Sequence, residues 1–216
     1  MIKLYNYFRS SASFRVRIAL NFKGLPYEYV PVHLLKDGGQ QFAPSFRTLN
    51  PDSLIPVLDD ESQVLTQSLA IIEYLEETRP QPPLLPRDVV ERAYVRSIAL
   101  AIACEIHPLN NLRVLRYLVK TLGLSEEQKN TWYRHWVEQG LTSLEARLVA
   151  EARSGRYALG DAITIADVVI VPQIFNAQRM DCNLGSVPTL MHIFDNCMQL
   201  PAFIDAHPSA QPDASR

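Results

Sequence analysis

The sequence predicts an α/β domain followed by an all-helical domain. In the first 32 residues, two strand-like segments flank a helix-like segment, which is the pattern of a βαβ unit. After a proline-rich stretch at residues 79–86, the remaining apolar residues recur at helical spacing. We therefore expect an α/β domain at residues 1–80, a linker at 81–87 and a helical domain at 88–216.

The α/β half can be followed in order. Residues 2–8 and 27–32 alternate like half-buried strands, with Pro31 suggesting an edge position or an early end to pairing. Between them, the apolar positions from Phe14 to Phe22 are helical in pattern, and Gly24 supplies a stop. A loop at Gly38 and a short irregular helix at 40–46 follow. Residues 54–58 and 63–65 predict a hairpin with its turn at 59–62, and the apolar-faced helix at 69–77 has Ser68 as its expected N-cap.

The helical half contains several amphipathic segments. We expect a helix at 89–122 that Pro108 kinks or interrupts, and another at 132–153. Thr164 and Asp167 have the spacing of a capping box, and the largely apolar helix that they open predicts the buried centre of this domain. A further helix is expected at 187–197, followed by a surface tail from Pro201.

Composition excludes several classes of function. A net charge of −2 and a pI near 6.2 argue against a nucleic-acid partner, and the apolar run at 98–104 is too short for a membrane span. No signal peptide is evident, and three widely spaced cysteines suit reduced thiols in the cytoplasm. Cys104 and His107 lack the further ligands of a metal site, so we expect no metal and a buried Cys104.

The stretch RSSASFRVRIA at residues 9–19 joins the first strand to the first helix. Its three serines, Ser10, Ser11 and Ser13, crowd the expected first turn. A helix start presents backbone N–H groups and the positive end of the helix dipole, so it can hold an anion or a thiolate, and a hydroxyl there can donate to sulfur. The alternative is that these serines only cap the helix.

Five stretches resemble the zeta-class glutathione transferases, whose best-known activity is that of maleylacetoacetate isomerase. They are RSSASFRVRIA (9–19), GQQF (39–42), LNP (49–51), QSLAIIEYLEE (67–77) and TIAD (164–167), and the likeness covers essentially the whole chain. The resemblance implies the glutathione transferase fold, with a thioredoxin-like first domain. It also implies glutathione as cofactor and a homodimer. The family signature usually has cysteine where this chain has Ala12, so this chain lacks that thiol at the helix start.

The resemblance assigns roles to individual residues. Ser10, assisted by Ser11 and Arg9, is expected to act on the glutathione thiolate. Ile55 is expected to pair with the tripeptide backbone, and the helix start at Ser68 to hold its γ-glutamyl carboxylate. The full set expected to bind glutathione is Ser10, Ser11, Ala12, Gln41, Ile55, Gln67, Ser68, His107 and Asn111. The alternatives are plain helix capping for Ser68 and a core histidine with satisfied hydrogen bonds for His107.

The implied reaction is the cis–trans isomerisation of maleylacetoacetate to fumarylacetoacetate in phenylalanine and tyrosine catabolism. A thiolate that adds to the double bond permits rotation and is then regenerated. Arginine suits the dicarboxylate substrate because its fork binds carboxylates bidentately, and we expect Arg9, Arg113 and Arg179 to do so. A surface or structural ion pair is the alternative for each. Arg15 and Arg17, inside the first helix, are assigned to structure or to a subunit interface.

Other functions stay open. Maleylpyruvate isomerase uses the same cofactor on a smaller diacid, and a broader transferase of α-halo acids would use the same thiolate. A non-catalytic glutathione-binding protein would be expected to lack the hydroxyl chemistry of Ser10, which is present. A thioredoxin-type reductase is disfavoured because the chain has no Cys-x-x-Cys.

Overall fold

The computed structural model describes residues 1–214, which divide into two compact units. The first contains residues 1–84 together with the C-terminal segment from Met198, and the second contains residues 85–197. The sequence-based division instead gave everything after residue 87 to the helical domain. The difference arises because the C-terminal segment packs on the first helix of the α/β unit.

A four-stranded sheet in the order β2-β1-β3-β4 forms the centre of the first unit. Its strands are β1 Ile2–Asn6, β2 Tyr27–Pro31, β3 Val57–Asp60 and β4 Gln63–Thr66. β2 is parallel to β1, whereas β3 is antiparallel to both β1 and β4. The predicted βαβ unit and the edge position of the strand with Pro31 are thereby confirmed.

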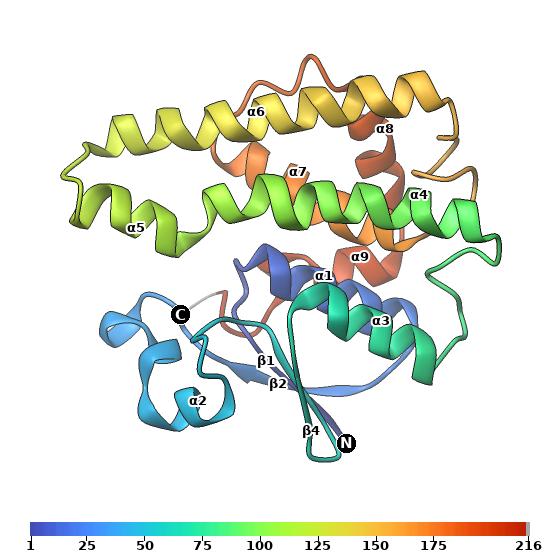
Figure 1. Cartoon of the computed structure of the whole chain (residues 1–216). Helices are drawn as coiled ribbons and strands as arrows, with labels where there is room; N and C mark the ends of the chain where they lie inside the picture. The colour runs from blue at the N-terminus through green and yellow to red at the C-terminus, as the bar shows by residue number, and fades with distance from the viewer. Residues whose placement is uncertain (215–216) are drawn as a thin grey trace. The chain divides into compact units, whose positions relative to one another are not determined.

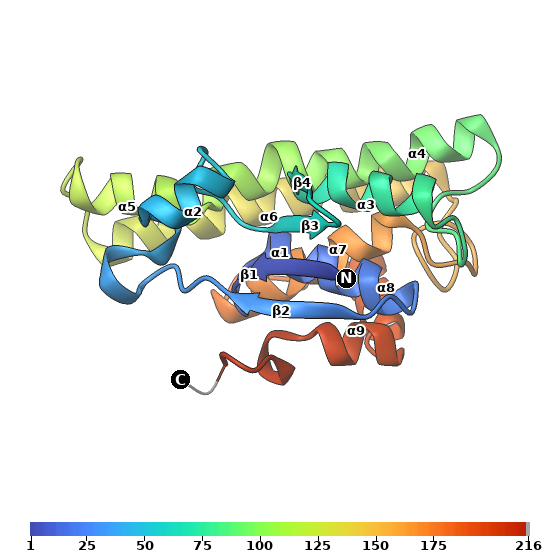
Figure 2. The ribbon, with the colours of Figure 1, turned by 90° about the horizontal axis from the view of Figure 1, so that it is seen from below.

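Helices cover this sheet. α1 (Ser11–Phe22) and α3 (Ser68–Thr78) lie side by side on one face (Figure 1). α9 (Pro201–Ala206), in red in Figure 2, packs along α1. Short 3-10 turns at Lys36–Gly38 and Gln40–Phe42 lead into α2 (Pro44–Leu49). The ring of Phe46 in α2 contacts that of Tyr5 in β1, with centroids 6.4 Å apart, so α2 covers the face to which Tyr5 points.

Three expectations for this unit were wrong. The hairpin turn consists of Glu61 and Ser62, whose φ values of 52° and 74° suit a tight two-residue turn, so the preceding aspartates belong to β3. The N-cap of α3 is Gln67, and Ser68 is already helical. The expected surface tail instead forms α9 and a 3-10 turn at Pro208–Ala210, with Phe203 fully buried.

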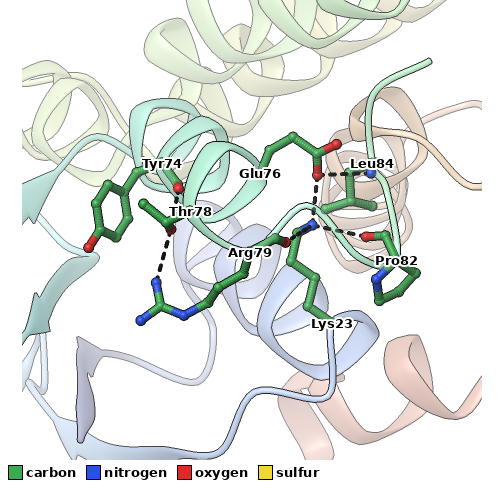
Figure 3. A network of polar contacts seen from close by, with 7 residues as sticks. All are labelled: Lys23, Tyr74, Glu76, Thr78, Arg79, Pro82 and Leu84. Atoms are coloured by element: carbon green, nitrogen blue, oxygen red, sulfur yellow. Dashed lines mark hydrogen bonds and ion pairs between the residues drawn. The ribbon is translucent and has the colours of Figure 1, made fainter. Parts of the chain in front are cut away.

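A buried lysine fixes the start of the proline-rich linker (Figure 3). The side chain of Lys23, which follows α1, has no exposed surface, and its Nζ lies 2.7 Å from Oε2 of Glu76 in α3. The same ammonium donates to the carbonyl oxygens of Arg79 and Pro82, each at 2.9 Å. Glu76 also accepts from the backbone N–H of Leu84 at 3.0 Å. The linker therefore leaves this unit along a path set by one ion pair.

The second unit is helical, as predicted. It contains α4 (Val89–Leu100), a π-helical segment Ala101–Ile106, a 3-10 turn His107–Asn110, α5 (Leu112–Lys120), α6 (Glu126–Glu151), α7 (Ile165–Arg179) and α8 (Pro188–Cys197). The interruption at Pro108 is confirmed. α6, the long yellow helix of Figure 1, begins earlier than predicted because Ser125 and Gln128 form a capping box.

α7 is the buried centre of this unit. Residues 165–174 are all buried, and the predicted capping box of Thr164 and Asp167 opens the helix. The Asp167 carboxylate, with no exposed surface, accepts from the N–H groups of Ala158 and Thr164, both at 2.8 Å. It thus joins the preceding loop to the helix start. Burial raises the pKa of Asp167 to about 6, against the effect of these hydrogen bonds.

Within residues 1–214, no helix has the length and apolar character to cross a membrane. Nor do the side chains of this part of the chain include a group of three or more His, Cys, Asp or Glu placed to hold a metal ion. The expectation that Cys104 is buried was wrong, because its side chain is exposed on the π-helical segment. A helical pattern interrupted by a π-turn shifts which residues face the core.

Candidate active site

The strand register brings several loops of the first unit to one end of the sheet. Asn6 at the end of β1 pairs with Pro31 at the end of β2, and Tyr5 pairs with Val57 at the start of β3. Val57 in turn pairs with Thr66 at the end of β4. The loops that follow β1, β2 and β4 and the loop that precedes β3 therefore leave the sheet at the same end. These loops carry Arg9, Ser10, Gln41, Ile55 and Gln67.

Ser10 is the N-cap of α1. Its φ of −70° and ψ of 118° are extended, and its Oγ accepts a hydrogen bond of 3.2 Å from the N–H of Ser13. Ser10 therefore caps the helix, as the capping interpretation predicts. A hydroxyl has one proton and two lone pairs, so an Oγ that accepts from Ser13 keeps its proton for another acceptor. The half-buried Ser10 can thus cap the helix and still donate to a ligand.

The neighbours of Ser10 differ in exposure. Ser11 and Ser13 are buried, Ala12 is half-buried, and Oγ of Ser13 has no hydrogen-bond partner within the described residues. The exposed Arg9 places its guanidinium over the ring of Phe8, 5.0 Å from the centroid. This end of α1 therefore combines the positive end of a helix dipole with one exposed cation.

The start of α3 is capped by Gln67 and not by Ser68 as expected. Gln67 has a φ of 67°, a conformation that costs a residue other than glycine roughly 1–3 kcal/mol and that clusters at functional sites. Oγ of the buried Ser68 accepts a hydrogen bond of 3.2 Å from Nη1 of Arg15. The sequence alone assigned Arg15 only to structure or to an interface. Its position as a charged residue in an apolar helix could have indicated that it binds a buried partner. It links the starts of α1 and α3.

Gln41 and Ile55 lie on the remaining two loops of this sheet end. Gln41 is 4% exposed, and its Oε1 has no hydrogen-bond partner in the described part of the chain. Such an orphaned acceptor is costly unless a ligand or water completes it. Ile55 is half-buried against Val32, Phe46 and Val57, and it precedes a cis peptide bond to Pro56. Its backbone stands directly before β3, beside the end of β4.

The other predicted residues belong to the helical unit. His107 is half-buried in the 3-10 turn, and Asn111 caps α5 by accepting from the N–H of Arg113 at 3.1 Å. The side chain of Arg113 is exposed. Trp132 of α6 holds this turn, because its Nε1 donates to the carbonyl of Leu109 at 2.8 Å. His107, Asn111 and Arg113 are thus fixed in one short segment.

Arg179 lies at the exposed end of α7 and acts electrostatically on Tyr133 of α6. Burial raises the pKa of Tyr133, the residue after Trp132, to about 12, and the positive charge of Arg179 acts in the opposite direction. Two adjacent residues of α6 thus relate to the predicted site residues of this unit. Trp132 hydrogen-bonds to the turn that bears His107, and Tyr133 is affected by the positive charge of Arg179.

Comparison with known proteins decides the family. The family model of the glutathione S-transferase N-terminal domain matches residues 4–83. A probable maleylacetoacetate isomerase of Vibrio cholerae is 51% identical over 98% of this chain and 97% of its own length. The chain belongs to the zeta-class glutathione transferases.

Two solved structures of this zeta-class family are particularly similar. One is a holo maleylpyruvate isomerase described as a bacterial zeta-class glutathione S-transferase, with a TM-score of 0.95 and 47% identity over 98% of this chain and 99% of that one. The other is a maleylacetoacetate isomerase of Methylobacterium extorquens AM1 with bound malonate and glutathione. Its TM-score is 0.94 and its identity 42%, over the same shares of the two chains. The predicted glutathione transferase fold is confirmed.

Proposed function

We propose that this zeta-class protein is a glutathione-dependent cis–trans isomerase that converts maleylacetoacetate to fumarylacetoacetate. The observation that carries the proposal is the start of α1, where Ser10 caps the helix through a lone pair and retains its proton for a sulfur atom. The 51% identity to a probable maleylacetoacetate isomerase supports the choice of substrate. A dicarboxylate, malonate, together with glutathione in a 42% identical relative supports the ligand class.

The residues of the first unit fit glutathione. The orphaned Oε1 of the buried Gln41 offers an acceptor for an amide or ammonium group. The backbone of Ile55 can pair with the peptide, and Gln67 and Ser68 at the start of α3 suit its γ-glutamyl carboxylate, because a helix start favours an anion. Ser10, Ser11 and Ala12 would hold the thiol end. His107 and Asn111 are further candidates from the helical unit.

Glutathione, when bound, supplies the thiolate that adds reversibly to the double bond of the substrate. The residues of this chain keep that sulfur ionised and bind the diacid. The Ser10 hydroxyl and the dipole of α1 both favour an anion, and so they lower the pKa of a thiol at this helix start. Arg9, Arg113 and Arg179 can bind the two carboxylates and stabilise the negative charge that develops during the reaction.

A glutathione-dependence assay tests this proposal. Wild type and Ser10→Ala are offered maleylacetoacetate and maleylpyruvate separately, with and without glutathione. We expect turnover that requires glutathione and that falls about a hundredfold or more in the variant, since removal of one preorganised donor costs on that order. Undiminished turnover in Ser10→Ala, or turnover without glutathione, would contradict the mechanism.

Maleylpyruvate is the second candidate substrate. The holo maleylpyruvate isomerase structure is 47% identical with a TM-score of 0.95, which is as strong a likeness over the whole chain. The smaller diacid would use the same thiolate and the same arginines. The ratio of the two kcat/KM values in the assay decides between the substrates.

We also propose that the chain acts as a homodimer in the cytoplasm. Val89 and Val90, on the first turn of α4, expose 75% and 59% of their surface, and burial at an interface would remove this apolar area from water. The three cysteines are free thiols, as a reducing compartment requires. Sedimentation velocity of the wild type and of Val89→Glu tests the dimer, and a monomeric wild type would rule it out.

A further inference from the structure

The short segment between β1 and α1 is hydrogen-bonded to the side chains of Arg17 and Asp213, which the proposed mechanism does not use. Tyr7 and Phe8 connect the last residue of β1 to Arg9 and Ser10. The carbonyl of Tyr7 accepts from the N–H of Ser10 at 3.0 Å, so the backbone of this segment is coupled directly to the helix cap. A group that restrains the backbone of Tyr7 and Phe8 therefore also restrains Ser10.

Arg17 holds the carbonyl side of the segment. Its side chain has no exposed surface, and Nη2 donates to the carbonyl of Phe8 at 3.0 Å while Nη1 reaches that of Tyr7 at 3.4 Å. Nη1 also donates to Oδ1 of Asn6 at 3.0 Å, and Nε donates to the carbonyl of Ala206 in α9 at 3.0 Å. One buried guanidinium thus ties the C-terminal segment to the residues before the cap.

Asp213 binds the N–H side of the same segment. Its Oδ2 accepts from the N–H of Phe8 at 3.2 Å, and its Oδ1 accepts from the hydroxyl of Tyr29 at 2.5 Å. Burial, reinforced by this hydrogen bond, raises the pKa of Tyr29 far above its ordinary value, so the phenol remains a donor. Asp213 itself is 8% exposed. Both backbone polar groups of Phe8 are therefore bound by side chains, one of them 205 residues away in sequence.

We propose that Asp213 is a positioning residue for the isomerase site: with Tyr29 and Arg17 it clamps the backbone of Phe8 and thereby sets where the Arg9 side chain and the Ser10 hydroxyl lie. The inference rests on the proposed function, because Arg9 and Ser10 are the groups assigned there to substrate and thiolate. The reaction depends on geometry at this loop, and a displacement of about 1 Å can cost on the order of a hundredfold in rate.

Substitution of Asp213 in the full-length protein tests the clamp. Asp213→Ala removes both hydrogen bonds, whereas Asp213→Asn can accept from Phe8 and donate to Tyr29, because a phenol oxygen also accepts. We expect kcat/KM to fall about tenfold in Asp213→Ala, mainly through kcat, and to recover most of that loss in Asp213→Asn. Asp205→Ala, an exposed carboxylate on the same C-terminal segment, is the matched control and should behave as wild type.

Amide hydrogen exchange at Arg9 and Ser10 supplies a readout that does not need the isomerase reaction. We expect faster exchange at these two residues in Asp213→Ala, with core amides of β1 and α1 unchanged. Unchanged exchange and unchanged kcat in Asp213→Ala would overturn the proposal, as would a lower Tm with kcat intact. If the wild type isomerises neither diacid, the proposed function fails, and local exchange together with the Kd for glutathione still decides whether Asp213 positions the loop.

Discussion

Arg15 of α1 and Ser68 of α3 are 53 residues apart in sequence, yet Nη1 of Arg15 donates a hydrogen bond of 3.2 Å to Oγ of Ser68. Arg15 is 2% exposed, so this bond lies in the interior of the first unit. It joins the helix start assigned to the thiol to the helix start assigned to the γ-glutamyl carboxylate. This bond therefore connects the two helices whose starts form the two ends of the proposed glutathione site.

Removing this link should weaken glutathione binding. We expect Arg15→Met and Ser68→Ala each to raise the Kd for glutathione about tenfold, since a hydrogen bond to a charged group contributes roughly 1.5–3 kcal/mol. Calorimetric titration of both single variants and the double variant measures the coupling. If the two effects are fully additive, the residues do not act through each other.

Ser10 has two roles that substitution can separate. Ser10→Ala loses the helix cap, which costs about 1 kcal/mol of stability, whereas Ser10→Gly loses only a few tenths. Both variants lose the hydroxyl proton. We therefore expect Ser10→Gly to be nearly as stable as wild type in thermal unfolding but as inactive as Ser10→Ala. An active Ser10→Gly enzyme would show that the hydroxyl contributes through capping alone.

Restoring the cysteine of the family signature should have little effect. The helix dipole and the Ser10 hydroxyl are the larger electrostatic contributions at this helix start, and a neutral S–H is a weak donor. We expect Ala12→Cys to change kcat/KM by no more than about threefold, which corresponds to well under 1 kcal/mol. Steady-state kinetics with each diacid checks this. A tenfold gain would mean that the thiol has a part in turnover that this chain lacks.

The ion pair of Lys23 should be essential for stability. Its ammonium is fully buried with three oxygen acceptors, so Lys23→Met removes the positive charge beside Glu76, which keeps the N–H of Leu84, and removes the donor of two carbonyls (Figure 3). We expect a loss of about 3 kcal/mol or more in the free energy of unfolding. Lys3→Met is the matched control, because the Lys3–Glu28 pair is half-exposed and such pairs contribute at most about 1 kcal/mol. Urea unfolding compares the two.

The buried Asp167 should make stability depend on pH. Its folded-state pKa of about 6 lies above the ordinary value of 3.8, so the folded protein binds more protons between these pH values. The resulting contribution is fully present below pH 3.8 and is lost as the pH rises through 6; it amounts to roughly 3 kcal/mol at 1.36 kcal/mol per pH unit. Unfolding free energies of wild type and Asp167→Asn between pH 4 and 7 measure it. If the unfolding free energies of the two proteins changed with pH in parallel, the raised pKa of Asp167 would be contradicted.

The candidate site could be predicted only in part from local sequence. The Ser10 cap and the capping box of Thr164 and Asp167 depend on residues at most three positions apart, so their spacing carries the information. The start of α3 was mispredicted because the local sequence shows neither that Gln67 adopts a φ of 67° nor that Ser68 accepts from Arg15 on another helix. The exposed Cys104 was missed because a π-helical segment changes the helical phase.

The sequence by itself determined the order along the chain of the four strands and of most helices, the separation of an α/β half from a helical half and the serine-rich helix start, since all of these follow from periodicity and local capping. Only the tertiary structure decided that the C-terminal segment belongs to the first unit and that Asp213 and Arg17 hold the loop before Ser10. The physical reason is that a buried charge needs partners from wherever the chain supplies them. No local pattern shows that Asp213 accepts a hydrogen bond from the N–H of Phe8.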